Sequence, residues 1–600
     1  MKQGINRSVA ARKGRRGMVL VGVMMVLMMI MAISLIGIGS NASVSDATRG
    51  TANLTRKRSA SYQAQNLADT GIRAVLQWLN VQSAAPTNMS PFRPSQVATF
   101  WTGATVNGNY DRVTFNDPTN NTIGTIDVRV HPFGDNNTVT MRSYLVESVG
   151  TYSGHKQIVR AAIIQDTFAK YAFFSDYAPV NTWWTAGSTI FNGPVHVNAR
   201  NMVSGTPDYD PNAAIKILWQ NVNNRQIFKY AGDGAFTTAA SSSQVKWYRG
   251  NQTTLAPPSG TTQWGRVAAG GEPTVKAGVA AVEMPTQSTR QQDAALGTPP
   301  ATIPSGPSVT VPANSGATCG GIYVNGNVDD MKLTASGTNN TVQGIEIFQN
   351  DGTRKIKTVI SIDPNSGADG TVTITKFQTA NMSGTTYTQV GSPSAFAGRT
   401  NGVLYVNGNV GSPSVPPTGN PDGTPTTWGS GGVSGKVANS VVSGGTVTKQ
   451  SALSIVTGST NSVNISGDIV YASTSGGNAV TQSGILGIVS KKVQLLSNLV
   501  GDDMNDGLAT VTVHATVMAY DTFNAEAPLN RPIANFNLLG GYIVKSPGTF
   551  AGIDNAGTQW TGFAVNRNYD SRVANTPPPF FPSTGNQYKI RSYQRVAATL

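Results

Sequence analysis

The feature that most constrains this chain is an uncharged apolar run, MVLVGVMMVLMMIMAISLIGIG, over residues 18–39. A helix of about twenty apolar residues can cross a bilayer. The segment before the run is basic and holds no acid, and its charges are Lys2, Arg7, Arg12, Lys13, Arg15 and Arg16. Basic flanks stay on the cytoplasmic side. We therefore expect a single-pass protein of the inner membrane, with a cytoplasmic N-terminus and a periplasmic or extracellular bulk.

The residue at the boundary between the basic segment and the apolar run is Gly17. An ordinary secretory signal has a shorter core and a small-residue cleavage site after it, whereas Gly17 comes before the core. This position predicts a leader, residues 1–17, that is cut between Gly17 and Met18 and leaves the apolar segment intact. A simple signal anchor is the alternative.

A polar helical pattern follows the apolar run and includes SYQAQNLADTGIRAVL, which begins at Ser61. Together with RRGMVLVGV, this stretch resembles the N-terminal region of PilX-type minor pilins of type IV pili. It is similar also to the K-type minor pseudopilin of type II secretion. The resemblance implies a prepilin-type leader, a prepilin peptidase, methylation of the Met18 amine, and assembly with other pilins or pseudopilins. The helical residues that fill the family pattern and are assigned to assembly include Ala64, Ala68 and Gly71.

One position departs from the pattern of major pilins, which have a glutamate at the fifth residue of the mature chain. The fifth residue counted from Met18 is Gly22. A carboxylate in an apolar environment is costly unless it is paired. Its absence favours a low-copy subunit at a tip or priming complex over a bulk filament subunit. Alternatively, Gly22 only lets neighbouring helices approach closely.

The expected fold class is α+β and mostly β. A transmembrane and stalk helix is expected over residues 18–82, because its apolar positions recur at helical spacing. A pilin-like α/β region with a small antiparallel sheet is expected over 83–186, since short alternating runs such as GTIDVRVHPF are bounded by turn residues.

The rest of the chain, residues 187–600, is rich in Gly, Ser, Thr, Asn and Val. GGIYVNGNV from Gly320 recurs as GVLYVNGNV from Gly402. Short strands with alternating Val, Ile and Leu predict a solenoid-like domain of the parallel β-helix type, with a β-sandwich as the alternative. Long loops are expected at about 204–315 and 411–435, where Pro, Gln and Gly accumulate.

Composition excludes several function classes. The net charge is +14, but six of the basic residues lie in the leader and the others are scattered, so nucleic acid is not an expected partner. The four His residues have no ligand spacing, and the acidic loop GDDMNDG from Gly501 lacks the calcium-loop pattern. We expect no catalytic residue, no metal and no cofactor.

The leading hypothesis is therefore a minor subunit or assembly protein of a type IV pilus or pseudopilus that displays a large β domain. Its head would serve adhesion or structure, with a surface or glycan ligand. The alternatives are an anchored surface solenoid outside any filament and a solenoid carbohydrate-active enzyme.

Overall fold

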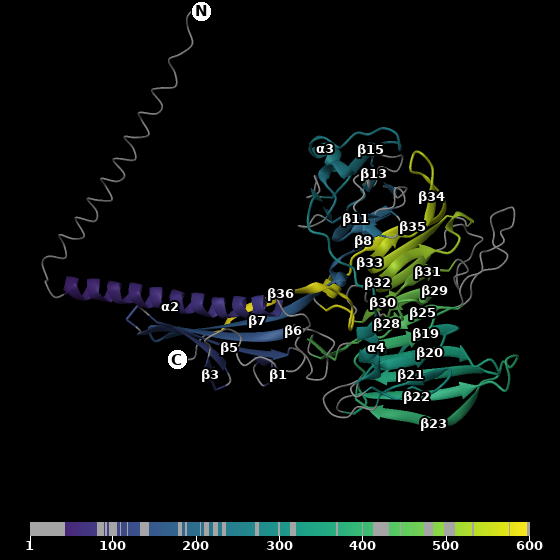
Figure 1. Cartoon of the computed structure of the whole chain (residues 1–600), viewed down its shortest axis with the longest axis horizontal. Helices are drawn as coiled ribbons and strands as arrows, with labels where there is room; N and C mark the ends of the chain where they lie inside the picture. The colour runs from purple at the N-terminus through teal and green to yellow at the C-terminus, as the bar shows by residue number, and fades with distance from the viewer. Residues whose placement is uncertain are drawn as a thin grey trace, which may run out of the picture.

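The computed structural model describes residues 43–596 with gaps, chiefly 81–88, 95–104, 133–142, 209–214, 221–225, 231–235, 271–274, 313–319, 412–430, 473–483 and 497–509. Two bodies are visible in Figure 1: a helix lying along a small sheet, and a tall stack of β-strands beside it. The predicted leader and the apolar run at 18–39 lie outside the described residues, as do Gly17, Met18 and Gly22.

The first body, here called the helix-on-sheet domain, consists of helix α2 (Ser43–Asn80) and a six-stranded antiparallel sheet. The order of strands across this sheet is β3 (Thr105–Asn107), β4 (Tyr110–Asn116), β5 (Thr122–Pro132), β6 (Ser143–Tyr152), β7 (His155–Thr167) and β36 (Ser583–Val596). Two short strands, β1 (Met89–Ser90) and β2 (Arg93–Pro94), pair beside it.

The predicted fold class, which opens on a long transmembrane and stalk helix, is wrong for the described residues. These are mostly β-strand, and their α-helices are α2, α3 (Gly260–Trp264) and α4 (Thr289–Leu296). None of the helices in this part of the chain is both long and apolar enough to cross a membrane. α2 is long but polar, since charged residues such as Arg56, Lys57 and Arg58 interrupt its surface. The prediction of a single-pass membrane protein is corrected by the same finding.

The helix and the sheet are held together by an unusually close approach. Ala64, Ala68, Ile72 and Leu79 of α2 are buried against the sheet. Strand β6 faces the helix with Gly150, where an added Cβ would lie 1.9 Å from the carbonyl oxygen of Ala64. Only a residue without a side chain fits there, because close packing leaves no room for even one extra carbon.

The second body, here called the stacked β domain, is inserted between two neighbouring strands of the small sheet. It occupies residues 168–582, between β7 and β36, and these two strands pair with each other along much of their length. At the joint, Thr167 is the register partner of Ser583, and the amide of Phe168 donates to the carbonyl oxygen of Pro582 at 3.0 Å. The chain therefore enters and leaves the stacked β domain at one point (Figure 1).

A long parallel sheet runs along one side of the stack. Successive pairs join β18 (Ile322–Asn325), β24 (Val403–Asn407), β28 (Ala452–Thr457), β30 (Ile485–Ser490), β32 (Thr510–Ala525), β33 (Ala534–Pro547), β8 (Phe173–Tyr177), β11 (Val195–Val203), β14 (Phe236–Thr238) and β16 (Val275–Lys276). Most of these neighbours belong to successive turns of the chain.

Each turn of the chain crosses three sides of the stack. Segments of β32 pair in succession with β29 (Ser462–Tyr471), β30 and β31 (Lys492–Leu495). The other two sides also hold β25 (Val433–Val437), β35 (Gln559–Asn568), β10 (Thr189–Asn192), β9 (Trp183–Thr185), β13 (Ile215–Trp219) and β15 (Val245–Arg249). Inward Val, Ile, Leu and Phe fill the space between the three sides.

The chain enters this stack in its middle. β8, the first strand of the domain, pairs with β33, and β10 pairs with β35, although more than 360 residues separate these partners. From β8 the chain builds one half of the stack through β16. It then crosses to the far end through α4, which contacts β18 and β24, and builds the other half back to β35.

The predicted loop at 204–315 is wrong in part. It contains β13, β14, β15 and β16, besides the shorter β12 (Thr206–Asp208) and β17 (Ser308–Thr310). An antiparallel arm leaves the lower end of the stack, formed by β19 (Asp330–Ser336), β20 (Val342–Asn350), β21 (Lys355–Asp363), β22 (Thr371–Gln378) and β23 (Thr388–Ala397). Three further short strands are β26 (Val441–Ser443), β27 (Thr446–Lys449) and β34 (Ala551–Ile553).

Candidate functional site

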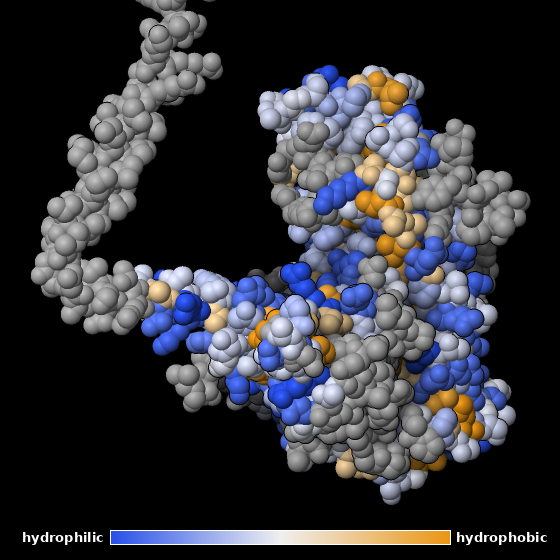
Figure 2. Space-filling view, turned by 60° about the vertical axis from the view of Figure 1, so that its left-hand side comes forward, coloured by the Kyte–Doolittle hydropathy of each residue, from blue (hydrophilic) through white to orange (hydrophobic). Residues whose placement is uncertain are grey.

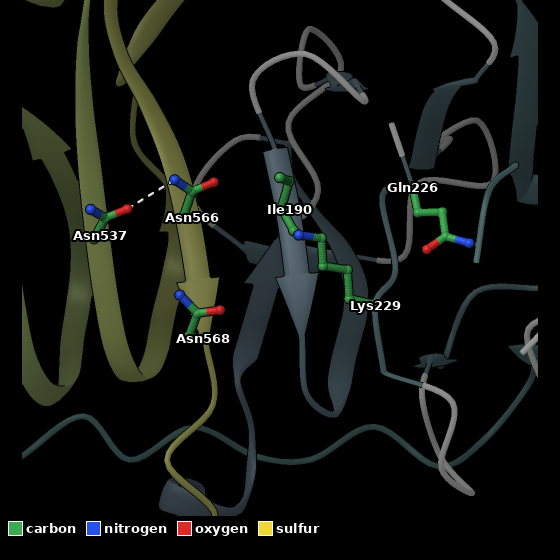
Figure 3. Close-up of a pocket in the computed structure, with 6 residues that line it drawn as sticks. All are labelled: Ile190, Gln226, Lys229, Asn537, Asn566 and Asn568. Carbon is green, nitrogen blue, oxygen red and sulfur yellow. Dashed lines mark hydrogen bonds between the residues drawn. The ribbon is translucent and has the colours of Figure 1, made fainter. Parts of the chain in front are cut away.

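A cavity of about 530 Å³ opens on the outer surface of four adjacent turns of the stack. Its lining residues are Ile190, Gln226, Lys229, Asn537, Asn566 and Asn568 (Figure 3). The strand pairing explains why they meet: Asn566 of β35 is in register with Asn537 of β33 on one side and with Ile190 of β10 on the other. Segments more than 300 residues apart in sequence thus form one surface.

Strand alternation turns the polar side chains outward. On β33, Phe536 and Leu538 are buried while Asn537 between them is half-buried. On β35, Val565 and Arg567 are buried while Asn566 and Asn568 face out. Successive side chains of a strand point to opposite faces, so a spacing of two residues places asparagines on one face.

Hydrogen bonds orient two of the amide side chains. Asn566 Nδ2 donates to Asn537 Oδ1 at 2.9 Å, which leaves the Oδ1 of Asn566 as an acceptor on the side of Ile190 (Figure 3). Gln226 Nε2 donates to the carbonyl oxygen of Gly265 at 2.7 Å, so its Oε1 remains an acceptor. The side-chain amides are thus fixed by rigid strands and by one another.

Lys229 supplies the charge of the cavity. It follows Phe228, which bridges to Phe191 of β10, and its side chain extends toward Ile190 (Figure 3). Lys229 is exposed, and no carboxylate occurs among the lining residues that the structure describes. A cavity with amides and one cation can donate and accept hydrogen bonds and attract a negative charge.

A buried cation lies behind the cavity. Arg567 lies between Asn566 and Asn568 but points inward, with its guanidinium carbon 4.7 Å from the ring centre of Tyr542 and 5.4 Å from those of Phe173 and Phe191. Burial lowers the pKa of Arg567 to about 10, because a charge is poorly solvated there. Cation–π contacts offset part of that cost.

Other polar clusters of the stack are structural. His196 contacts Thr237 and Asn198, and Asn198 in turn donates to the carboxylate of Asp176 and to the carbonyl oxygen of Val282. This buried chain of hydrogen bonds fixes the segment that leads to α4. Within the described part of the chain no three potential metal ligands come together.

The residues assigned to assembly lie elsewhere. Ala64, Ala68 and Gly71 are part of the contact between α2 and its sheet, and a Cβ added to Gly71 would lie 2.7 Å from Val128. Their structural role is therefore packing within this chain, and a role in assembly stays a prediction.

The lining asparagines were not among the site residues predicted from the sequence. The available signal was the repeated Asn-x-Asn pattern at Asn535–Asn537 and at Asn566–Asn568, within strands. That pattern gives two outward amides on one strand, but only the register between β33 and β35 shows that the two pairs are neighbours.

Comparisons with known proteins give little. A scan against family models finds no match. A search of curated proteins finds none either. Among solved structures, the chain is similar to the competence-associated pilin ComZ from Thermus thermophilus, at 13% identity and a TM-score of 0.26, over 90% of this chain and 97% of that chain. A TM-score this low carries no argument about fold or function. The similarity is to a pilin, but the finer prediction of a PilX-type or K-type subunit is not confirmed.

Proposed function

We propose that this chain is a pilus-related minor subunit whose stacked β domain is a binding head. The observation that supports the proposal is the insertion of residues 168–582 between β7 and β36 of the helix-on-sheet domain. Two paired strands, β7 and β36, connect the two bodies. The chain therefore crosses twice between them at a single place, and this double connection fixes the head on its support. A single flexible linker would leave its orientation free.

The helix-on-sheet domain is the part that would contact other subunits. The first half of α2 extends from the sheet: residues 51–59 are all exposed, and Leu54 and Tyr62 are 59% and 68% exposed. Large apolar side chains on a projecting helix are available to a neighbouring helix. We propose that other pilins or pseudopilins cover this half, after a prepilin peptidase has cut the chain between Gly17 and Met18.

The head is proposed to bind without catalysis. The cavity offers amides and one lysine, whereas glycosidic cleavage needs two opposed carboxyl groups. The described part of the face in Figure 2 is mainly hydrophilic with scattered apolar patches, which suits contact with a hydrated ligand.

The proposal is tested with sheared filaments from cells that express the full chain. We expect the chain in the filament fraction, with a mature N-terminus at Met18 by intact mass. A Leu54→Ser/Tyr62→Ser double variant should be depleted from that fraction. Leu529→Ser, 51% exposed on the stacked β domain, is the matched control and should be retained. Absence of the full chain from filaments, or equal retention of the double variant, would overturn the proposal.

A further inference from the structure

We propose that the cavity lined by Asn537, Asn566, Asn568, Gln226 and Lys229 binds an acidic sugar, a ring with several hydroxyls and one carboxylate. The inference deepens the proposed function by naming the ligand class of the head. It rests on the geometry of the cavity, which stands whether or not the chain enters a filament.

The amides match the hydroxyls of a sugar. A hydroxyl both donates and accepts, so its best partners present a donor and an acceptor close together. The Asn566–Asn537 hydrogen bond leaves the Oδ1 of Asn566 as an acceptor on the side of Ile190, and Asn568, two residues along β35, presents an amide donor beside it (Figure 3). Positions two residues apart on a strand point to the same face, so these two groups face one ligand together. The side chain of Asn568, two residues along β35, has no hydrogen bond to any described residue and adds a second donor and acceptor.

Lys229 matches the carboxylate. It forms no ion pair with any residue that the structure describes, and no acid among the described lining residues neutralises it. A lone ammonium at the rim of a polar cavity attracts a single negative charge and gives a charge-assisted hydrogen bond to it. One cation suits a monoacidic sugar better than a polyphosphate, which needs several cations or a cluster of backbone N–H groups.

The cavity has a size and a support that suit this ligand. Its volume of about 530 Å³ is within the range of small-molecule sites, roughly 300–1,000 Å³. Its walls are strands of a packed stack, and the inward side chain of Arg567 packs on Tyr542 behind Asn566. A preformed site loses little conformational entropy on binding.

The experiment measures binding of the purified full chain to defined glycans by isothermal titration. The probes are a galacturonate oligomer and a sialyl-lactose, which represent two sources of the same chemistry, each with its carboxyl-reduced, neutral counterpart. We expect binding of at least one acidic probe and roughly tenfold weaker binding of its neutral counterpart, from loss of one charge-assisted hydrogen bond.

Variants separate the two halves of the argument. Lys229→Gln should lower the affinity for the acidic probe about tenfold and reduce the salt dependence of its binding. The affinity for the neutral probe should stay unchanged. Asn566→Ala and Asn568→Ala should lower the affinity for the acidic and the neutral probes alike. Lys491→Gln, an exposed lysine outside the cavity, is the matched control and should bind as the parent does. Unchanged melting curves show that each variant folds.

Three results would overturn the inference: no binding of either acidic probe, equal binding of acidic and reduced probes, or unchanged affinity in Lys229→Gln and Asn566→Ala. The proposed function fails separately, when the chain is absent from filaments although the purified protein binds the sugar through these residues.

Discussion

At the scale of single residues, Arg567 is costly to the fold. It is buried among aromatic rings, and its Nε and Nη1 atoms have no hydrogen-bond partner among the residues that the structure describes. Its lowered pKa of about 10 means that the protein disfavours the charged form. Apolar replacement of buried ionic groups is often stabilising. We expect Arg567→Met to raise the free energy of unfolding by roughly 1–3 kcal/mol, measured by chemical denaturation.

Arg591→Met is the control for that variant, because Arg591 is exposed on β36. Its free energy of unfolding should change by less than about 0.5 kcal/mol. If the Arg567→Met variant is less stable than the parent, the free energy of the cation–π contacts exceeds the cost of burying the charge.

The titration of His196 makes the stability of the protein depend on pH. Its Nε2 donates to Asn198 Oδ1, and burial lowers the pKa of His196 from 6.5 to about 4, with the nearby Lys170 adding to the shift. The unfolded chain therefore binds a proton at this residue before the folded chain does. The stabilisation is complete above pH 6.5 and is lost as pH falls from 6.5 to 4, by up to about 3 kcal/mol.

Unfolding free energies measured between pH 7.5 and 4.5 check this prediction. His196→Gln should be less stable at pH 7.5 but should lose less stability on acidification than the parent does, by about 2 kcal/mol at pH 5. Parallel pH profiles for parent and variant would contradict it.

Gly150 fixes the distance between helix and sheet. A Cβ at this position would lie 1.9 Å from the Ala64 carbonyl oxygen and 2.5 Å from the Ala68 nitrogen, and backbone atoms cannot turn aside as a side chain does. We expect Gly150→Ala to destabilise the helix-on-sheet domain by about 1–3 kcal/mol or more. Hydrogen exchange of α2 measures the effect. Thr151→Ala, at the neighbouring position, should leave exchange nearly unchanged.

At the scale of elements, the long parallel sheet is covered on its outer side as well as its inner side. Phe580 and Phe581 of the segment after β35 are buried against it, together with Tyr405, Val489 and other residues. The segment is also hydrogen-bonded, since Gln291 of α4 donates to the Phe580 carbonyl oxygen at 2.9 Å. This outer cover explains why every residue of β30 is buried.

The cover yields a prediction for Phe581. Removal of a buried phenylalanine ring costs about 3–5 kcal/mol, so Phe581→Ala should lower the free energy of unfolding of the stacked β domain by that amount. Thermal denaturation followed by β-sheet circular dichroism measures it. Trp560→Ala removes a larger ring that is 59% exposed and should cost less than about 1 kcal/mol. Equal losses would mean that the segment does not cover the sheet in solution.

The elements also show what the sequence could and could not predict. Period-two alternation predicted strands such as GTIDVRVHPF, because one face of each is buried. The strands β14 and β16 were missed inside a predicted loop, since each has at most three residues and too few positions for a pattern. The cavity was missed because Asn537 and Asn566 meet only through strand register, which local sequence does not encode.

At the scale of the whole molecule, the order of the chain differs from the order in space. The last strand, β36, lies in the small sheet rather than in the solenoid-like region predicted for residues 187–600. The first strand of the stacked β domain, β8, lies in the middle of the stack, between β33 and β11. The middle therefore closes only when segments near both ends of the inserted domain come together, and such non-local pairing is slow to form.

The insertion predicts that the helix-on-sheet domain folds without the head. Thr167 and Ser583 are register partners in an antiparallel pair, so a two-residue Asn-Gly turn joins them as a hairpin when residues 168–582 are removed. The core of this domain draws on α2, β5, β6, β7 and Tyr588 of β36, all of which the shortened chain keeps. We expect residues 43–167, the turn and residues 583–596 to give a cooperative melt with helical and β circular dichroism. A variant that also lacks β36 is the control, and it should melt at a lower temperature, since β7 loses the partner strand that pairs along residues 158–167. A shortened chain that stays unfolded would show that the head is required for its own support, and that the two bodies form one folding unit.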